Sequence, residues 1–352
     1  MCLRAAAGAV LAIAAAGKMG DGVSGATIIV DVQHPFLIDA AMTASSALAT
    51  TMALVRAWGM HFDPNECAQL AMRSENDVVG FPCGDGPALS ALYARRDCLT
   101  QIDCQTKSAP QHWTLPEGIT LIGIDCGHRH ADADEKYARA RATAFMGRVL
   151  VERILKSIDL DGHDWKGLLA RVRVADYASH LKDHLPMRTR GADFIECFGP
   201  TADPLTRIDP DAFYRIRSRT EHHIHEGGRT RDFAKHIAQS AGPDDRTSII
   251  KAGKIMRRSH WSYGQRCALG SVETDRLSSL LRRNDTRDGV YGARVSGHGS
   301  GGMMVVLMEA SDEARQKLNG VLTEYKEIIG RTATIHEGTS HGALEFGVHE
   351  VQ

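Results

Sequence analysis

The sequence predicts an α+β protein with two domains, and three observations support this prediction. The chain has 352 residues, enough for two domains and a large buried core. Most of it shows helical patterning, interrupted by short apolar runs typical of strands. The final third predicts a helix at residues 273–283, a glycine-rich hairpin at 291–308, a helix at 312–329 and a strand at 333–336. This order has the β-α-β-β-α-β character of a ferredoxin-like domain.

The earlier elements follow from local signals in chain order. The predicted elements are a strand at 26–32, helices at 43–58, 65–76 and 88–93, a strand at 120–124, an amphipathic helix at 135–156, a strand leading into a long helix at 213–240, and a helix at 248–263. Pro200, Pro204 and Pro210 interrupt the chain repeatedly, which predicts a domain boundary shortly after them. We therefore expect domains at residues 1–212 and 213–352.

Composition excludes several classes of protein. The net charge of −1 indicates neither a nucleic-acid partner nor a membrane surface. None of the eight cysteines forms a C-x-x-C pair, so we expect reduced thiols and a cytoplasmic protein. The sequence does not indicate the oligomeric state. Residues 1–17 carry one arginine and an alanine-rich run, which allows a weak signal peptide or a helical or frayed N-terminus. We favour the helical or frayed N-terminus, and the run is too short to span a membrane.

The glycine-rich stretch between residues 291 and 308 is the first candidate binding site. Its glycines and serine are Gly297, Gly299, Ser300, Gly301 and Gly302. Glycine allows positive φ angles and close backbone approach, and successive N–H groups in such a turn can bind an anion, with phosphate the first expectation. A strand follows the loop, whereas the dinucleotide fingerprint requires a helix, and the Gly-Lys-Ser/Thr of a Walker A loop is absent. A phosphate site and a plain glycine-rich hairpin both remain open.

A cluster of hydroxyl side chains lies at the expected start of the helix at 43–58. Thr43, Ser45 and Ser46 can act as N-caps, the commoner role, or can hold a phosphate together with the free N–H groups of the helix start.

Two histidine-containing clusters raise the question of a metal. The first, directly after the predicted strand at 120–124, contains Asp125, His128, His130, Asp132 and Asp134. Histidine and aspartate can ligate a metal, but the spacing matches no standard site, and Asp132 and Asp134 suit the start of the next helix. The second cluster is His222, His223 and His225, for which we favour a solvated helix face over a zinc site.

Several motifs, in order, resemble those of the GHMP kinases, and within them the galactokinase and L-arabinokinase branch. The matching segments are SENDVVGFPCG at 74–84, GIDCGHRH at 123–130, RRSHWSYGQRCALG at 257–270, YGARVSGHGSGG at 291–302 and EGTSHGALEFG at 337–347. The resemblance covers roughly residue 42 to the end. It implies an N-terminal domain like ribosomal protein S5 domain 2, here incomplete, and a ferredoxin-like C-terminal domain.

The resemblance also implies an activity and its ligands. The activity is ATP-dependent phosphorylation of a monosaccharide, with ATP and Mg²⁺ as cofactors. ATP phosphates would lie on the helix start near Thr43, Ser45 and Ser46, and the loop at 297–302 would close over the transferred phosphate or the sugar. The family binds magnesium through an acidic residue and a hydroxyl. Glu75 matches the acidic residue, and we take Ser45 as the hydroxyl among the three candidates.

The sequence also departs from the family pattern. We find no copy of the opening motif that contacts the reacting phosphate and the sugar, so the chain resembles an N-terminally truncated or divergent member. Counting from Gly84 places Pro87 where the family has its catalytic aspartate, and Asp85 lies two positions early. Asp85 is therefore the candidate base of a working sugar kinase. The alternative is a catalytically impaired relative that retains at most nucleotide binding, for which we expect very weak or absent sugar phosphorylation.

Overall fold

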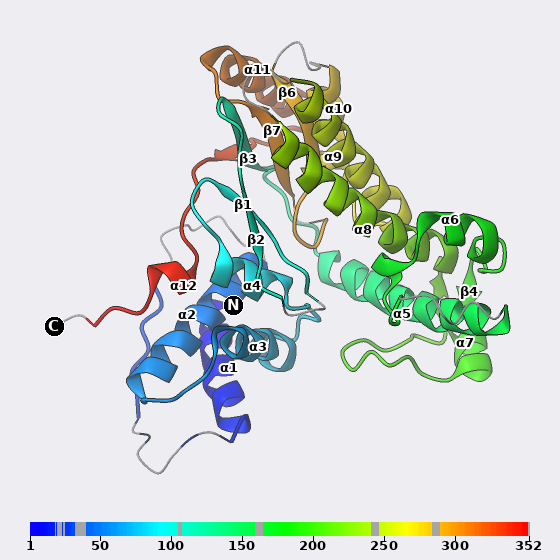
Figure 1. The fold of residues 1–352 in the computed structure, drawn as a ribbon, viewed down its shortest axis with the longest axis horizontal. Helices are drawn as coiled ribbons and strands as arrows, with labels where there is room; N and C mark the ends of the chain where they lie inside the picture. Colours follow the sequence, from blue (N-terminus) through cyan, green and yellow to red (C-terminus); the bar gives the residue numbers. More distant parts are fainter. Residues whose placement is uncertain are drawn as a thin grey trace. The chain divides into compact units, whose positions relative to one another are not determined.

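The computed structural model describes residues 1–17, 19, 23, 25–31, 40–104, 108–158, 165–240, 246–283, 289–300 and 302–350. The chain forms two compact units (Figure 1). Unit 1 combines Met1–Leu115 with Gly338–Gln352, and unit 2 is Pro116–Glu337. The boundary predicted at residue 212 lies inside unit 2, and the division into domains at that point remains a prediction.

Unit 1 is a cluster of helices with a small hairpin. Its elements are α1 (Cys2–Ala15), α2 (Ala40–Ala57), α3 (Pro64–Ser74), the π-helical turn η1 (Glu75–Val79), α4 (Gly86–Tyr93), β1 (Cys98–Gln101), β2 (Gln111–Thr114) and α12 (Ala343–Phe346). The expected N-terminal helix is thus present as α1, and its side chains Ala5 and Ile13 are fully buried against α2 and α3. Small side chains on these helices let their backbones approach closely, which is how an alanine-rich sequence makes a core.

Helix α3 begins where the sequence predicts. Asp63 accepts a hydrogen bond from the backbone of Glu66, the side chain of Glu66 accepts one from the backbone of Asp63, and Pro64 occupies the first turn. This capping box satisfies two backbone donors that the helix itself cannot pair.

Two predictions for the N-terminal region are wrong. Residues 26–31 form no strand, and residue 32 lies outside the described part of the chain. Ile29 is 89 % exposed, because none of the described strands pairs with this β-branched run. Helix α2 begins at Ala40, three residues before the predicted start, so Thr43 lies within the first turn and does not cap it.

Unit 2 contains the longer helices and the main sheet. Its elements are β3 (Ile119–Asp125), α5 (Ala133–Ser157), η2 (Leu169–Arg171), α6 (Val174–Asp176), η3 (Tyr177–Leu181), β4 (Thr189–Arg190), α7 (Gly191–Phe198), β5 (Phe213–Tyr214), α8 (Ile216–Gln239), α9 (Arg246–Cys267), α10 (Val272–Arg283), β6 (Val290–Val295), β7 (Met303–Glu309), α11 (Asp312–Ile329) and β8 (Thr334–His336). The sequence predicted the long helices to within a few residues at most of their ends.

The four-stranded sheet has the order β6-β7-β3-β8, and every neighbouring pair is antiparallel. Numbered along the chain, with β3 first, this is the order 2-3-1-4 of a β-α-β-β-α-β unit, which confirms the ferredoxin-like character. The opening strand is β3, far upstream of the final third. The predicted strand near residue 213 pairs with β4 instead, in a separate two-stranded sheet.

Helices cover both faces of this sheet (Figure 1). On one face, Leu277 of α10 and Leu318 of α11 pack with Ile124 and Val306 of the strands. On the other face, Gly253 of α9 lies so close to β6 that a Cβ atom there would be 2.0 Å from the carbonyl oxygen of Tyr291. This close contact fixes α9 on β6.

A second core in unit 2 joins α5, α7 and α8. Its largest fully buried side chains include Tyr177, Phe194 and Tyr214. Between residues 165 and 210 the chain forms mainly short helices, η2, α6, η3 and α7. The eight cysteines, all in described segments, form no disulfide. In the described ranges, none of the helices combines the length and hydrophobicity needed to cross a lipid bilayer.

Candidate functional site

In unit 1 the candidate site is centred on the carboxylate of Glu75, at the junction of α3 and η1. Glu75 is fully buried. Its carboxylate accepts a hydrogen bond from the hydroxyl of Thr43 on α2, and the thiol of Cys83 lies 3.3 Å from it. A carboxylate is rarely buried without partners, and these contacts satisfy it in part. The structure thus joins two of the residues that the sequence singled out, Thr43 and Glu75.

The chain folds back on itself directly after Glu75. Gly80 has a φ of +85°, and the N–H groups of Gly80 and Phe81 both donate to the carbonyl oxygen of Glu75, at 2.9 and 3.0 Å. The side chain of Asn76 accepts a hydrogen bond of 2.9 Å from the backbone of Cys83. The motif at 74–84 therefore forms a tight turn that brings Cys83 back to Glu75.

Helix geometry separates the three hydroxyl residues of α2. Residues two apart lie about 200° apart around a helix, whereas residues three apart share a face. Thr43 is buried against Glu75, Ser46 is one turn further and half-buried, and Ser45 is exposed. Since only the first four N–H groups of a helix lack internal partners, those of Ser45 and Ser46 lie beyond the free donors of a helix that begins at Ala40. Thr43 is thus better placed than Ser45 to share a ligand with Glu75.

Asp85 and Pro87 lie at the start of α4. Asp85 occupies the N-cap position without a side-chain capping bond, and Pro87 lies in the first turn. The side chain of Asp85 is half-buried, and its negative charge acts on the neighbouring thiol of Cys104. Burial and then the charges of Asp85 and Asp103 raise the pKa of Cys104. The Asp85 carboxylate thus faces the small hollow lined by Cys104 and Tyr93.

In unit 2 the glycine-rich loop joins β6 to β7. Gly297, Gly299, Ser300 and Gly302 all have φ angles between +48° and +84°, as the sequence predicts for such a turn. Gly301 lies outside the described residues. The loop is held by the protein itself, because the N–H of Ser300 donates to the carbonyl of Leu269 at 2.8 Å and the side chain of Ser300 is fully buried.

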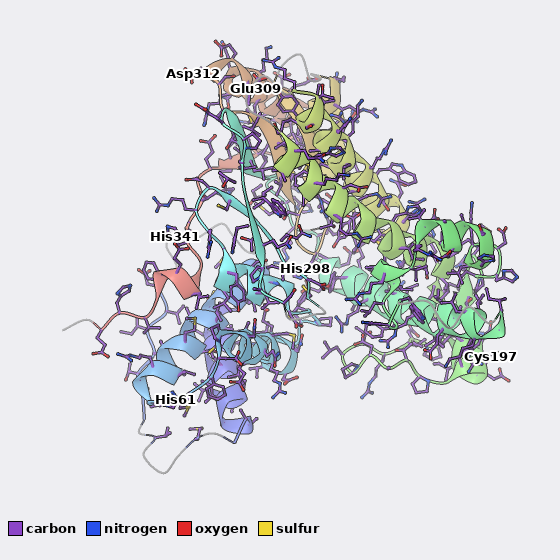
Figure 2. The ribbon with its side chains drawn as sticks, viewed as in Figure 1. His61, Cys197, His298, Glu309, Asp312 and His341 are labelled. Atoms are coloured by element: carbon purple, nitrogen blue, oxygen red, sulfur yellow. The ribbon has the colours of Figure 1, made fainter. Side chains whose placement is uncertain are left out.

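Two of the glycines are required by packing. A Cβ atom on Gly299 would lie 2.3 Å from the carbonyl oxygen of Leu269, and one on Gly302 would lie 2.2 Å from that of His128. From the sequence we expected these glycines to let the loop backbone approach a phosphate. At these two positions the loop instead approaches the backbone of the protein itself. Gly297 is exposed at the remaining edge of the loop, next to His298, which is labelled in Figure 2.

Helix α9 fastens this hairpin through the motif RRSHWSYG. His260 accepts a hydrogen bond of 3.1 Å from the N–H of Val295, and the hydroxyl of Tyr263 donates to the carbonyl of Gly297 at 3.0 Å. Arg257 donates to the carbonyl of Tyr291 at 2.7 Å. The sequence did not assign these roles. The only signal was the spacing of the polar residues, at 257, 260 and 263, on one helix face.

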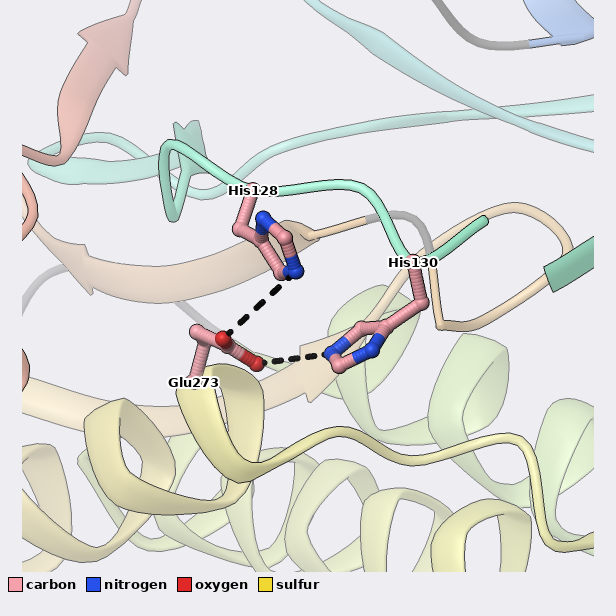
Figure 3. Close-up of side chains that lie close together, drawn as sticks. All are labelled: His128, His130 and Glu273. Carbon is pink, nitrogen blue, oxygen red and sulfur yellow. Dashed lines mark hydrogen bonds and ion pairs between the residues drawn. The ribbon is translucent and has the colours of Figure 1, made fainter. Parts of the chain in front are cut away.

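The first histidine cluster is rearranged relative to the prediction (Figure 3). The Nε2 atoms of His128 and His130 lie 4.0 and 3.0 Å from the carboxylate of Glu273, at the start of α10. In the part of the chain that the structure describes, this is the one group of three side chains placed as metal ligands could be. The predicted aspartates have other partners: Asp125 accepts from the backbone of Gly127, Asp132 pairs with Lys136 and Asp134 pairs with Arg129.

The carboxylate of Glu273 lies beside both imidazoles. Burial acts to raise the pKa of Glu273, but the hydrogen bond from His130 and the nearby imidazoles outweigh it, so its pKa is lowered. The N–H of His130 also donates to the carbonyl of Ser300 at 3.3 Å. The cluster therefore connects the end of β3 with α10 and the glycine loop.

In the described part of the chain, the second histidine cluster does not form a group of metal ligands. The solvated helix face expected for it is wrong for His222. His222 is buried, and its Nδ1 lies 3.0 Å from the hydroxyl of Ser262. Burial, followed by the charge of His223, lowers the pKa of His222 to about 3. His225 instead approaches Glu221 on the same helix, at 3.8 Å.

Comparison with known proteins decides the family. The family model for the GHMP kinases N terminal domain matches residues 5–93, and that for the GHMP kinases C terminal matches residues 245–327. A galactokinase of Mycobacterium tuberculosis is 30 % identical over 314 residues, which cover 88 % of this chain and 70 % of that protein. The chain belongs to the GHMP kinase family.

Other relatives agree with this assignment. An L-arabinokinase of Arabidopsis thaliana is 30 % identical over 336 residues, and the match covers 87 % of this chain but only 32 % of that longer protein. The crystal structure of Lactococcus lactis galactokinase, solved in complex with galactose, superposes with a TM-score of 0.64 and 18 % identity, over 96 % of this chain and 74 % of that one. This GHMP kinase therefore has the fold that its motifs imply.

Proposed function

We propose that this GHMP kinase is an ATP-dependent sugar kinase, which transfers a phosphoryl group from ATP to a monosaccharide hydroxyl with the help of Mg²⁺. The observation that carries the proposal is the buried contact between Thr43 and Glu75. Its support is the family, whose matched relatives are named galactokinase and L-arabinokinase.

The donor set fits magnesium. Mg²⁺ prefers oxygen ligands and commonly uses one or two protein groups together with phosphate oxygens and water. Glu75 and Thr43 offer a carboxylate and a hydroxyl from two different helices, already in contact. When bound, the metal neutralises charge on the phosphates of ATP. Ser45, the hydroxyl first paired with Glu75 from the sequence, is exposed, so we now assign this role to Thr43.

The chain's own residues divide the remaining work. The first turn of α2, up to Met42, supplies the free N–H groups that bind phosphate, and Thr43 adds its hydroxyl. Asp85, at the N-terminus of α4, would accept the proton of the attacking sugar hydroxyl, a contribution of about two to four decades in rate.

A second candidate function is nucleotide binding without efficient phosphoryl transfer. Pro87 favours it, because proline has neither a carboxylate nor an N–H with which to orient a hydroxyl. The two functions share the site at Thr43 and Glu75 and differ only at Asp85.

One experiment separates them. ADP formation is measured with Mg–ATP and an excess of L-arabinose or D-galactose, for the unmodified protein and for Asp85→Asn. Sugar-stimulated ADP formation that Asp85→Asn removes supports the kinase with Asp85 as its base. Binding of Mg–ATP without sugar-stimulated ADP formation supports the second function.

A further inference from the structure

A basic hollow in unit 2 lies outside all the groups discussed above. Helices α8, α9 and α10 form an open hollow of about 480 Å³, lined by Arg229, Lys254, Arg257, Arg258, Trp261 and Arg282. Its lining contains five cationic side chains and no acidic one. The volume falls within the range of small-molecule sites.

Helix geometry explains how α9 makes most of this hollow. Lys254, Arg257, Arg258 and Trp261 follow the spacing i, i+3, i+4 and i+7, so they form one stripe on α9. Arg229 is contributed by α8 and Arg282 by the last turn of α10. A cation in the last turn of a helix is stabilised by the helix dipole, which explains the position of Arg282. The stripe on α9 begins eight residues after the start of the helix, so the dipole does not explain its cations.

The positive charge of this hollow is only partly compensated. Arg229 forms an ion pair of 2.9 Å with Glu226, and Arg257 donates to the carbonyl of Tyr291. Lys254, Arg258 and Arg282 have no ion pair or hydrogen bond within the described ranges. Like charges at this spacing on a helix repel one another, and the chain as a whole carries a net charge of −1. A concentration of uncompensated cations is therefore a local property of this face.

Trp261 adds an aromatic surface to the hollow. Its side chain is 55 % exposed, although an indole is normally among the more buried groups. Arg266 approaches its ring at 5.1 Å from the centroid. An exposed indole beside cations can stack on a planar ring while the cations bind phosphate, since guanidinium groups match phosphate oxygens in pairs.

We propose that this hollow is a second binding site, for a soluble phosphate-bearing metabolite. Lys254, Arg258 and Arg282 bind its phosphate groups, and Trp261 contacts any planar ring that it carries. The site belongs entirely to unit 2 and uses neither Thr43 nor Glu75, so it does not depend on the proposed kinase activity. Phosphate groups also occur on lipids, and the vesicle measurement below distinguishes a membrane surface from a soluble anion.

The test uses inorganic tripolyphosphate as the probe. Its affinity for the protein is measured by calorimetry in EDTA, so that no magnesium-dependent site contributes. Binding should weaken about tenfold or more in Arg258→Glu, because one charge-assisted contact is replaced by repulsion. Arg276→Glu is the matched control. Arg276 is an exposed arginine of α10 outside the lining, and the same change of charge there should alter the affinity less than about twofold at moderate salt.

Three results would overturn the proposal. These are no binding of tripolyphosphate by the unmodified protein, an equal loss in Arg258→Glu and Arg276→Glu, and Arg258-dependent sedimentation with phosphatidylserine vesicles in place of tripolyphosphate binding. Circular dichroism of both variants shows whether each is folded, and the double variant Lys254→Gln with Arg258→Gln repeats the test without introducing acidic groups.

Discussion

The hydroxyl of Ser74 donates a hydrogen bond of 2.7 Å to the carbonyl oxygen of Ala5, which lies 69 residues earlier in the chain. Ser74 immediately precedes Glu75, so this bond ties helix α1 to the position of the candidate magnesium ligand. Gly8, one turn further along α1, makes room for it, because a Cβ atom at Gly8 would lie 2.2 Å from the Ser74 hydroxyl.

The first prediction follows from this contact. Gly8→Val should lower the free energy of unfolding by about 1–3 kcal/mol, the usual cost of overpacking, and should weaken nucleotide binding through Glu75. Ala7→Val, on the exposed side of the same helix, is the control and should change stability by less than about 0.5 kcal/mol. Urea denaturation measures both. Equal midpoints for the two variants would show that α1 does not support Ser74.

The second prediction concerns magnesium. Glu75→Gln should reduce ATP binding strongly in the presence of Mg²⁺ and only slightly in EDTA, because it removes the charge that would hold the metal but keeps the shape of the side chain. Asp77→Asn, an exposed acid two residues later, should have little effect in either buffer. The readout is the increase in melting temperature that ATP causes. Equal losses in both buffers would assign Glu75 a structural role only.

The third prediction corrects an expectation for the glycine loop. From the sequence alone, Gly299→Val is expected to block a phosphate. The structure instead places Gly299 against Leu269 with a φ of +69°, so even Gly299→Ala should destabilise unit 2 by about 1–3 kcal/mol without any ligand.

Gly228→Ala is the matched control for that change. Gly228 lies within α8 with open space around it, and alanine there should be neutral or stabilising by up to about 1 kcal/mol. Thermal unfolding without nucleotide tests both variants. A normal melting temperature for Gly299→Ala, with ATP binding lost, would restore the direct phosphate role.

The fourth prediction concerns pH. Burial and then the neighbouring His223 lower the pKa of His222 to about 3. Glu226 acts to raise this pKa, and Arg229 and Arg294 lower it further. The unfolded chain takes up a proton near pH 6.5, whereas the folded chain does so only near pH 3. Stability should therefore fall as pH decreases from about 6.5 to about 3, with a contribution from this residue of about 1.4 kcal/mol per pH unit.

His222→Gln tests this, since glutamine cannot titrate but can still pair with Ser262. The variant should show a shallower loss of stability over this pH range, by about one proton, in urea denaturation at several pH values. His61→Gln, the same substitution at an exposed position of unit 1 (Figure 2), is the variant with which the slope is compared. An unchanged slope in His222→Gln would show that His222 does not titrate in this way.

Sequence patterns predicted local structure better than long-range pairing. The helix over residues 312–329 and the β6–β7 hairpin were predicted closely, because periodicity and turn chemistry are local signals. The pairing of β3 with β7, the partnership of His130 with Glu273 across 143 residues, and the absence of a strand at 26–31 depend on tertiary contacts. For the candidate site, the sequence singled out Thr43 and Glu75 as candidates, and the structure showed that they are in contact.

The measurement that tests the central claim most directly is sugar-stimulated formation of ADP from Mg–ATP, with L-arabinose and with D-galactose in excess. The proposal predicts stimulation by at least one of the sugars at a rate below the about 1–100 s⁻¹ typical of kinases, since Pro87 replaces the expected base. Asp85→Asn and Glu75→Gln should both remove the stimulation, and Asp77→Asn should keep it. Mg–ATP binding in the unmodified protein with no stimulation by either sugar would contradict the kinase and leave nucleotide binding as its function.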